Sequence, residues 1–161
     1  MEPHVTVLEL PGVAESPAAA RRLVRAEARR RGLPDHVEDA ALLLTSEVVT
    51  NAVLHARGPL QVAVPADDGG DRLRVEVSDR SAALPRRRDH GLDVTTGRGV
   101  RLIATLARAW GTERPSDVPG YAKTVWFEVD VRAPDVTAEG FADLDLGPDV
   151  DLTGPGAEPP R

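Results

Sequence analysis

The longest regular pattern in the sequence is an apolar stripe of helical period between residues 35 and 58. Its members recur every three or four residues, so they share one side of a helix, and that side must be buried against another layer. Two segments that follow, residues 60–66 and 72–79, alternate apolar and polar residues as half-buried strands do. The chain therefore has to pack a long helix on a sheet. The stripe consists of Val37, Ala41, Leu44, Val48 and Ala52, with Ala40, Leu43 and Leu54 expected to widen it.

The segments before this helix predict one strand and one further helix. Residues 5–10 alternate and are followed by a Pro-Gly pair, which indicates a short strand closed by a turn. Ser16, followed by proline, predicts an N-cap, and the helix that it opens is expected to stop at Gly32. Asp35 is expected to cap the long helix.

The rest of the chain predicts a mainly antiparallel sheet. A turn-rich connection between the two alternating segments favours a hairpin. Residues 80–96 lack periodicity, which is typical of a lid, a binding loop or disorder, and a helix is expected after them. Further strands are expected from Trp110 to about Arg114 and over residues 121–131. The predicted fold is an α+β two-layer sandwich, with helices on one face of a mostly antiparallel sheet.

Length and composition favour a single folded unit. A chain of 161 residues is long enough for one domain with a hydrophobic core and too short for two of ordinary size. Aromatic residues make up only 3%, so the core must be aliphatic. We expect an N-terminal strand within residues 1–13, a folded domain over residues 14–133, and a disordered segment rich in acids, proline and glycine over residues 134–161.

The net charge of −6 is confined to one end of the sequence. Residues 134–161 contain seven acidic side chains and one basic one, so residues 1–133 sum to zero. A neutral folded part has no long-range attraction for nucleic acid. The chain has no cysteine and no apolar run of the ~18 residues that a membrane span needs. We therefore expect a cytoplasmic protein that binds neither nucleic acid nor a membrane directly.

Three polar side chains recur at four-residue intervals beside the apolar stripe: Glu47, Asn51 and His55. This spacing places them along one side of the helix. An amide oxygen can coordinate a hydrated divalent ion, while a carboxylate one turn away holds a water or acts as a base. A solvated helix edge would also show this pattern, and the triplet alone does not decide between the two.

Two other features suggest ligand contacts. Asp79 ends a hydrophobic strand, where its carboxylate can accept hydrogen bonds from an exocyclic amine, although acids are common at strand ends. The turn at residues 97–99 precedes a helix. Its glycines leave backbone N–H groups open beside the positive end of the helix dipole, where a phosphate can bind. An ordinary turn would look the same, and no P-loop motif occurs in the sequence.

The order of these features is more informative than any one of them. The sequence presents E-x-x-x-N-A-x-x-H on a helix, an aspartate at a strand end, a long loop, G-R-G-V at a helix start, and K-T-V-W-F in the last strand. In this order it resembles the GHKL, or Bergerat-type, ATP-binding fold. It resembles most closely the stand-alone anti-sigma-factor kinases that are similar to histidine kinase ATPase modules. The resemblance runs from about Ala14 to Val131.

The resemblance implies a role for each matching residue. Glu47 matches the acid that activates the attacking hydroxyl or water, and Asn51 matches the magnesium ligand. Asp79 matches the acid that hydrogen-bonds the adenine amino group, and Thr124 matches the strand threonine near the adenine. The residues that match the phosphate-binding turn of the ATP lid are Gly97, Arg98 and Gly99.

The resemblance also implies a function: an ATP- and Mg²⁺-dependent serine/threonine kinase that phosphorylates an antagonist protein and also binds a sigma factor. Homodimer formation is left open. Related sequences usually continue from the aspartate as D-x-G-x-G, whereas Ser81 and Ala83 stand here in place of the glycines. The alternative is therefore a non-catalytic interaction module with a degenerate ATP site. Residues 86–88, a triple arginine, contact either phosphate or a partner and solvent. A nucleic-acid binder that uses the Arg-rich first helix is disfavoured by the neutral charge.

Overall fold

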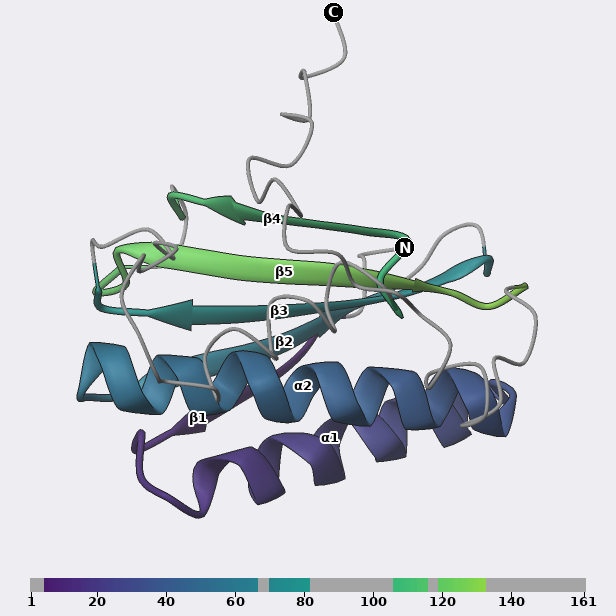
Figure 1. Cartoon of the computed structure of the whole chain (residues 1–161), viewed down its shortest axis with the longest axis horizontal. Helices are drawn as coiled ribbons and strands as arrows, with labels where there is room; N and C mark the ends of the chain where they lie inside the picture. Colours follow the sequence, from purple (N-terminus) through teal and green to yellow (C-terminus); the bar gives the residue numbers. More distant parts are fainter. Residues whose placement is uncertain (1–4, 67–69, 82–105, 116–118, 133–161) are drawn as a thin grey trace, which may run out of the picture.

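The computed structural model describes residues 5–66, 70–81, 106–115 and 119–132, and it shows a five-stranded sheet that carries two helices on one face (Figure 1). In chain order the elements are β1 (Val5–Leu10), α1 (Ser16–Arg30), α2 (Asp35–Ala56), β2 (Leu60–Pro65), β3 (Arg72–Asp79), β4 (Ala109–Glu113) and β5 (Lys123–Asp130). The predicted α+β sandwich is therefore confirmed. Neither described helix is long and apolar enough to cross a membrane.

The strand order is β1-β2-β3-β5-β4, and every described pair of strands is antiparallel. The last strand, β5, therefore lies between β3 and β4. It pairs with β3 over the full length of both strands, from Arg72 opposite Asp130 to Asp79 opposite Lys123. Residues that lie opposite each other project to the same face of a sheet, so this register decides which side chains can meet.

The helix-covered face of the sheet is aliphatic and forms the core. Alternate residues of β2, β3 and β5 project to it, and the largest of them, Phe127, is fully buried. The five central residues of the predicted α2 stripe, from Val37 to Ala52, lie against this face and are buried. The buried sheet residues on this face are Leu60, Val62, Val64, Leu73, Val75, Val77, Phe127 and Val129.

Two predicted members of the α2 stripe are exposed instead. Leu43 is 39% exposed and Leu54 is 60% exposed, whereas Thr45 and Val49 are fully buried. The reason is α1, which packs along the side of α2 that carries Ser46, whose hydroxyl accepts a hydrogen bond from α1 at 2.9 Å. Two elements and not one cover α2, so its buried side is turned towards α1.

Both helices have their N-cap one residue before the predicted position. α1 begins at Ser16 itself, whose buried hydroxyl accepts a hydrogen bond from the amide of Val13 at 3.1 Å and caps nothing. α2 begins at Asp35, with Pro34 in the cap position. The helix α1 ends at Arg30, with Arg31 in the C-cap position and Gly32 next at a φ of 66°. The prediction that Gly32 stops the helix agrees with this arrangement.

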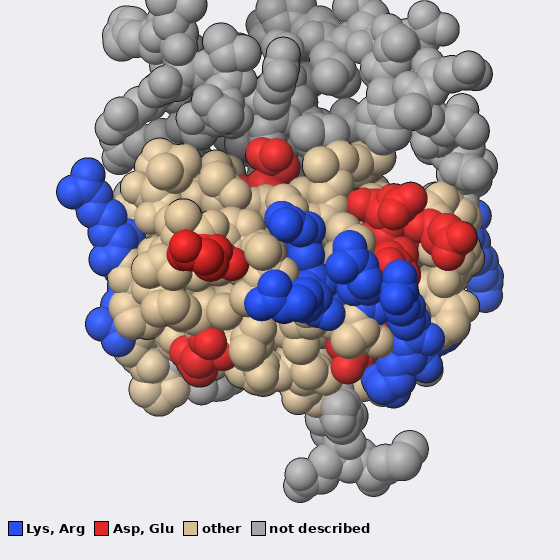
Figure 2. Space-filling model, turned by 90° about the horizontal axis from the view of Figure 1, so that it is seen from below, with Lys and Arg blue, Asp and Glu red and all other residues tan. Residues whose placement is uncertain are grey.

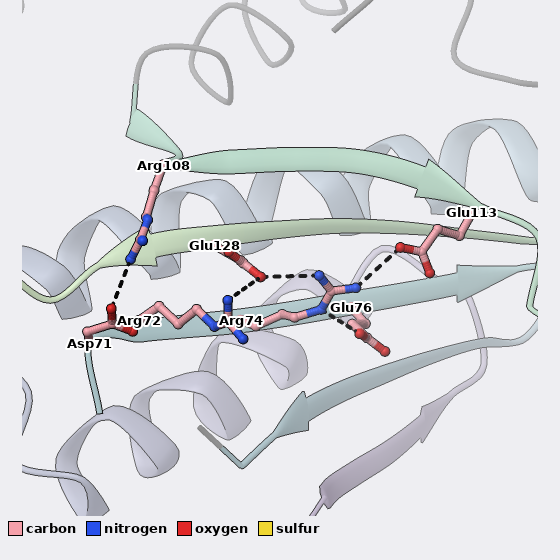
Figure 3. Close-up of polar contacts among 7 residues, drawn as sticks. All are labelled: Asp71, Arg72, Arg74, Glu76, Arg108, Glu113 and Glu128. Carbon is pink, nitrogen blue, oxygen red and sulfur yellow. Dashed lines mark hydrogen bonds and ion pairs between the residues drawn. The ribbon is translucent and has the colours of Figure 1, made fainter. Parts of the chain in front are cut away.

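The other face of the sheet carries a network of charged side chains (Figure 3). Arg74 lies at its centre: it donates hydrogen bonds to Glu76 at 2.7 Å and to Glu128 at 3.2 Å, and its guanidinium carbon lies 4.1 Å from the centroid of the Trp126 ring. Burial by itself lowers the pKa of Arg74, but the carboxylates of Glu76 and Glu128 raise it above its ordinary value. Arg74 therefore stays charged and ties β3 to β5.

Candidate functional site

Asp79, the last residue of β3, is a buried carboxylate on the helix-covered face of the sheet. It is only 2% exposed. Its Oδ1 accepts a hydrogen bond from the amide of Ser81 at 2.8 Å, and its Oδ2 lies 3.4 Å from Nζ of Lys123. An ionised carboxylate has about four acceptor positions. These two partners therefore leave Asp79 able to accept a hydrogen bond from a ligand.

Lys123 is the site residue that the sequence did not reveal. It lies opposite Asp79 in the register of β3 and β5, and it is 7% exposed. Its ammonium group and the Asp79 carboxylate form an ion pair with little access to water. The only local signal was a lysine before the threonine of K-T-V-W-F, and nothing near it in the sequence indicates a carboxylate partner.

Thr124 is not brought together with Asp79. Side chains alternate along β5, so Thr124 projects to the face opposite that of Asp79 and Lys123. Its hydroxyl lies 2.7 Å from the hydroxyl of Ser78, which is its partner in the register. If Asp79 holds an adenine, the neighbour of that base on β5 is therefore Lys123 and not Thr124.

Glu47 and Asn51 lie on one edge of the buried side of α2. Both side chains are partly buried, and neither makes a hydrogen bond or ion pair with another described residue. At about 3.6 residues per turn they lie on the edge that faces away from α1, because the opposite edge carries Glu38 and Ser46, which contact α1. His55 is exposed, one turn further along.

The fold places Glu47 and Asn51 on the helix layer and Asp79 on the sheet face that this layer covers. α2 packs on the face of β3 to which Asp79 belongs, and both elements end on the same side of the molecule (Figure 1). A polar ligand held here would meet a buried carboxylate from the sheet and two side chains without described partners from the helix. Their roles in a common site stay a prediction.

The donor set fits a magnesium nucleotide better than a protein-held metal ion. Within the described ranges no three His, Cys, Asp or Glu side chains cluster as metal ligands. Magnesium commonly takes one or two protein ligands and completes its shell with waters and substrate phosphates. The amide oxygen of Asn51 suits that role. The residues predicted to hold the phosphates, Gly97, Arg98 and Gly99, and the arginines at 86–88 lie outside the described residues.

A row of polar side chains crosses the uncovered face of the sheet beside the site. Gln61 Nε2 donates a hydrogen bond to Glu9 at 2.6 Å, and the hydroxyl of Tyr121 donates to the same carboxylate. Burial, followed by this hydrogen bond and the charge of Glu9, raises the pKa of Tyr121 to about 12. Tyr121 precedes β5, so its phenol links the segment before β5 to the edge strand β1.

The single tyrosine of the chain makes this contact directly measurable. Spectroscopic titration of the phenolate is expected to give a midpoint near 12, and Glu9→Gln should move it towards the ordinary value of 10. The raised pKa means that the contribution to stability is complete below pH 10 and is lost as the pH rises towards 12. Glu15→Gln, at an exposed position before α1, is the control and should leave the midpoint unchanged. A wild-type midpoint of 10 would contradict the contact.

Comparison with protein families gives one match. The model of the histidine kinase-like ATPase domain matches residues 10–121, which is well over half of the chain. The matched range contains both described helices, β2, β3 and β4, and the predicted site residues other than Thr124. Among curated proteins, none matches this chain.

Proposed function

Because this chain belongs to the histidine kinase-like ATPase domain family, we propose that it is a serine/threonine kinase of the anti-sigma-factor type, which binds Mg-ATP and phosphorylates an antagonist protein. The family supports the ATP-binding regulatory role, and the kinase activity, the antagonist, a sigma factor and a cytoplasmic location belong to the proposal. The observation that carries it is the buried carboxylate of Asp79 on the face covered by α2, with Asn51 and Glu47 on that helix.

Asp79 is proposed to recognise the adenine. Its carboxylate is held in one orientation by the amide of Ser81 and by Lys123, so little freedom is lost when it accepts a hydrogen bond from the exocyclic amine. A hydrogen bond to a charged group contributes about 1.5–3 kcal/mol. Lys123 balances the charge of Asp79 in a place that water barely reaches.

The two α2 side chains are proposed to act on the phosphate end. The amide oxygen of Asn51 would coordinate the magnesium ion that accompanies the nucleotide. Glu47 would accept the hydroxyl proton of the antagonist's serine or threonine, as that oxygen bonds to the γ-phosphorus and the bond to the departing ADP breaks. Phosphoryl transfer depends mainly on such positioning and charge neutralisation.

The test separates binding from transfer. Wild-type protein is expected to bind Mg-ATP in a calorimetric titration and to transfer labelled phosphate to an antagonist. Glu47→Gln should keep the binding and lower the transfer rate by about 10²–10⁴-fold, the usual contribution of a general base. Asp39→Asn, at an exposed position of the same helix, is the matched control. Binding without transfer to any candidate antagonist would exclude the kinase.

The second candidate, a non-catalytic interaction module, is favoured by the ion pair at Asp79. Lys123 already occupies one oxygen of the carboxylate, and the backbone amide of Ser81 occupies the other. If these contacts exclude the base, Mg-ATP will give no heat and no increase in melting temperature. A ligand that binds only the native state must raise its stability, so that result would support this candidate.

A further inference from the structure

α1 presents a stripe of arginines on the outer surface of the helix layer. Figure 2 shows basic side chains running across the surface seen from the helix side. The side chains of Arg25, Arg29 and Arg30 are 41%, 68% and 56% exposed, and Arg22 is exposed as well. The stripe, called the α1 arginine stripe below, consists of Arg21, Arg22, Arg25, Arg29 and Arg30.

Two buried glutamates anchor this stripe but do not neutralise it. Glu38 of α2 lies 3.3 Å from both Arg25 and Arg29, and Glu27 lies 2.8 Å from Arg30. Burial raises the pKa of Glu27, but its contacts with Arg30 and other neighbours lower it below the ordinary value, so it stays charged. Five guanidinium groups thus face two carboxylates. α1 by itself carries five arginines and one glutamate, a net charge of +4, although residues 15–56 together sum to zero.

Several of these arginines are held in place and not freely solvated. Arg21 donates a hydrogen bond to the hydroxyl of Ser46 at 2.9 Å. Together with the two glutamates, this contact fixes the stems of the stripe and leaves its outer guanidinium groups towards solvent. Because these arginines are already ordered, they lose little conformational entropy when an acidic segment binds to them.

The same chain supplies a segment of opposite charge. We propose that residues 134–161, which carry −6, dock on the α1 arginine stripe and cover it. This segment begins two residues after Arg132, the last described residue. A random coil of 28 residues would have a root-mean-square length of about 30 Å, and α1 is about 22 Å long. The acidic residues are spread along it as Asp135, Glu139, Asp143, Asp145, Asp149, Asp151 and Glu158.

Docking of this kind would make the segment an internal competitor for the stripe. Tethering gives it an effective concentration in the millimolar range, so a weak electrostatic contact is sufficient. An acidic partner protein would have to displace it. The contact should weaken as salt screens the exposed charges, since the Debye length falls to about 3 Å at 1 M. The proposal does not depend on ATP binding.

The absence of cysteine allows a clean test in the full-length chain. A nitroxide on Ala142→Cys should broaden the amide NMR signals of α1 at low salt much more than those of β4 on the far edge of the sheet. The broadening should disappear near 1 M salt. It should also disappear when the seven acids of residues 134–161 are replaced by Asn or Gln, a change outside the described fold. Equal broadening everywhere, or none at low salt, would overturn the proposal.

Two further samples test the stripe and the intramolecular geometry. Arg22→Gln with Arg25→Gln and Arg29→Gln should reduce the broadening, whereas the same loss of charge at Arg108, Arg114 and Arg132, which are exposed outside α1, should not. The second sample mixes isotope-labelled chain without nitroxide and unlabelled chain with it. Broadening of α1 in that mixture at the same strength would mean docking on a second copy and would contradict the proposal.

Discussion

Replacing Asp79 by Asn is expected to reduce the affinity for Mg-ATP about 30-fold or more, which is the loss of one hydrogen bond to a charged acceptor. The amide group would also direct N–H donors at an amine that is itself a donor. Because the variant would break the buried ion pair with Lys123, it should also lose about 3–5 kcal/mol of unfolding free energy. Calorimetric titration and urea unfolding measure the two effects separately.

The double variant Asp79→Asn with Lys123→Met separates recognition from folding. Removing the ammonium together with the carboxylate replaces both members of the buried ion pair, so most of the stability should return while ATP affinity stays low. Asp71→Asn is the matched control, because Asp71 pairs with Arg108 at 3.3 Å and both side chains are about two-fifths exposed. An exposed pair contributes about 0–1 kcal/mol. Restored ATP binding in the double variant would remove Asp79 from the adenine site.

Gly12→Ala is expected to cost about 4 kcal/mol of unfolding free energy, the sum of a backbone clash and an unfavourable backbone angle. Gly12 follows β1 with a φ of 73°, and a Cβ there would overlap the carbonyl oxygen of Gly58 and lie 2.8 Å from its carbonyl carbon. That carbonyl belongs to the backbone and has no side-chain freedom to move aside. The clash would separate the turn after β1 from the connection between α2 and β2.

Gly32→Ala is the matched control for this prediction. Gly32 has a similar φ of 66°, but nothing lies within 4 Å of the position that a Cβ would take. Only the backbone angle is unfavourable there, at a cost of about 1 kcal/mol. Urea unfolding followed by circular dichroism gives both values. Equal losses in the two variants would show that the contact between Gly12 and Gly58 contributes nothing.

Most elements of the fold follow from patterns that are local in the sequence. The bounds of β1 and β3 agree with the prediction, and the stripe of α2 is buried from Val37 to Ala52. These patterns can be recognised in the sequence because one face of each element contacts the core and the other contacts water. The prediction was wrong only at the edges of the stripe, where Leu43 and Leu54 are exposed. The hydrophobic period of α2 does not show on which side of α2 the other helix, α1, packs.

The sequence predicted the positions of those candidate site residues that a local pattern marks, such as the end of a strand or one side of a helix. Asp79 lies at a strand end, as predicted, and Asn51 and Glu47 lie on the open edge of α2 without partners among the described residues. The partner of Asp79 was not predictable. Lys123 is 44 residues further along the chain, and no periodicity connects the two positions.

The sequence by itself determined that a long helix with one buried side packs on alternating strands, because those periods reflect how each element is divided between core and solvent. Only the tertiary structure decided which side chain of β5 meets Asp79. Side chains change face at every residue of a strand, so a shift of one residue in the pairing of β3 with β5 would put Thr124 and not Lys123 beside the carboxylate. That pairing is set by the packing of distant segments, and with it the chemistry available to a bound nucleotide.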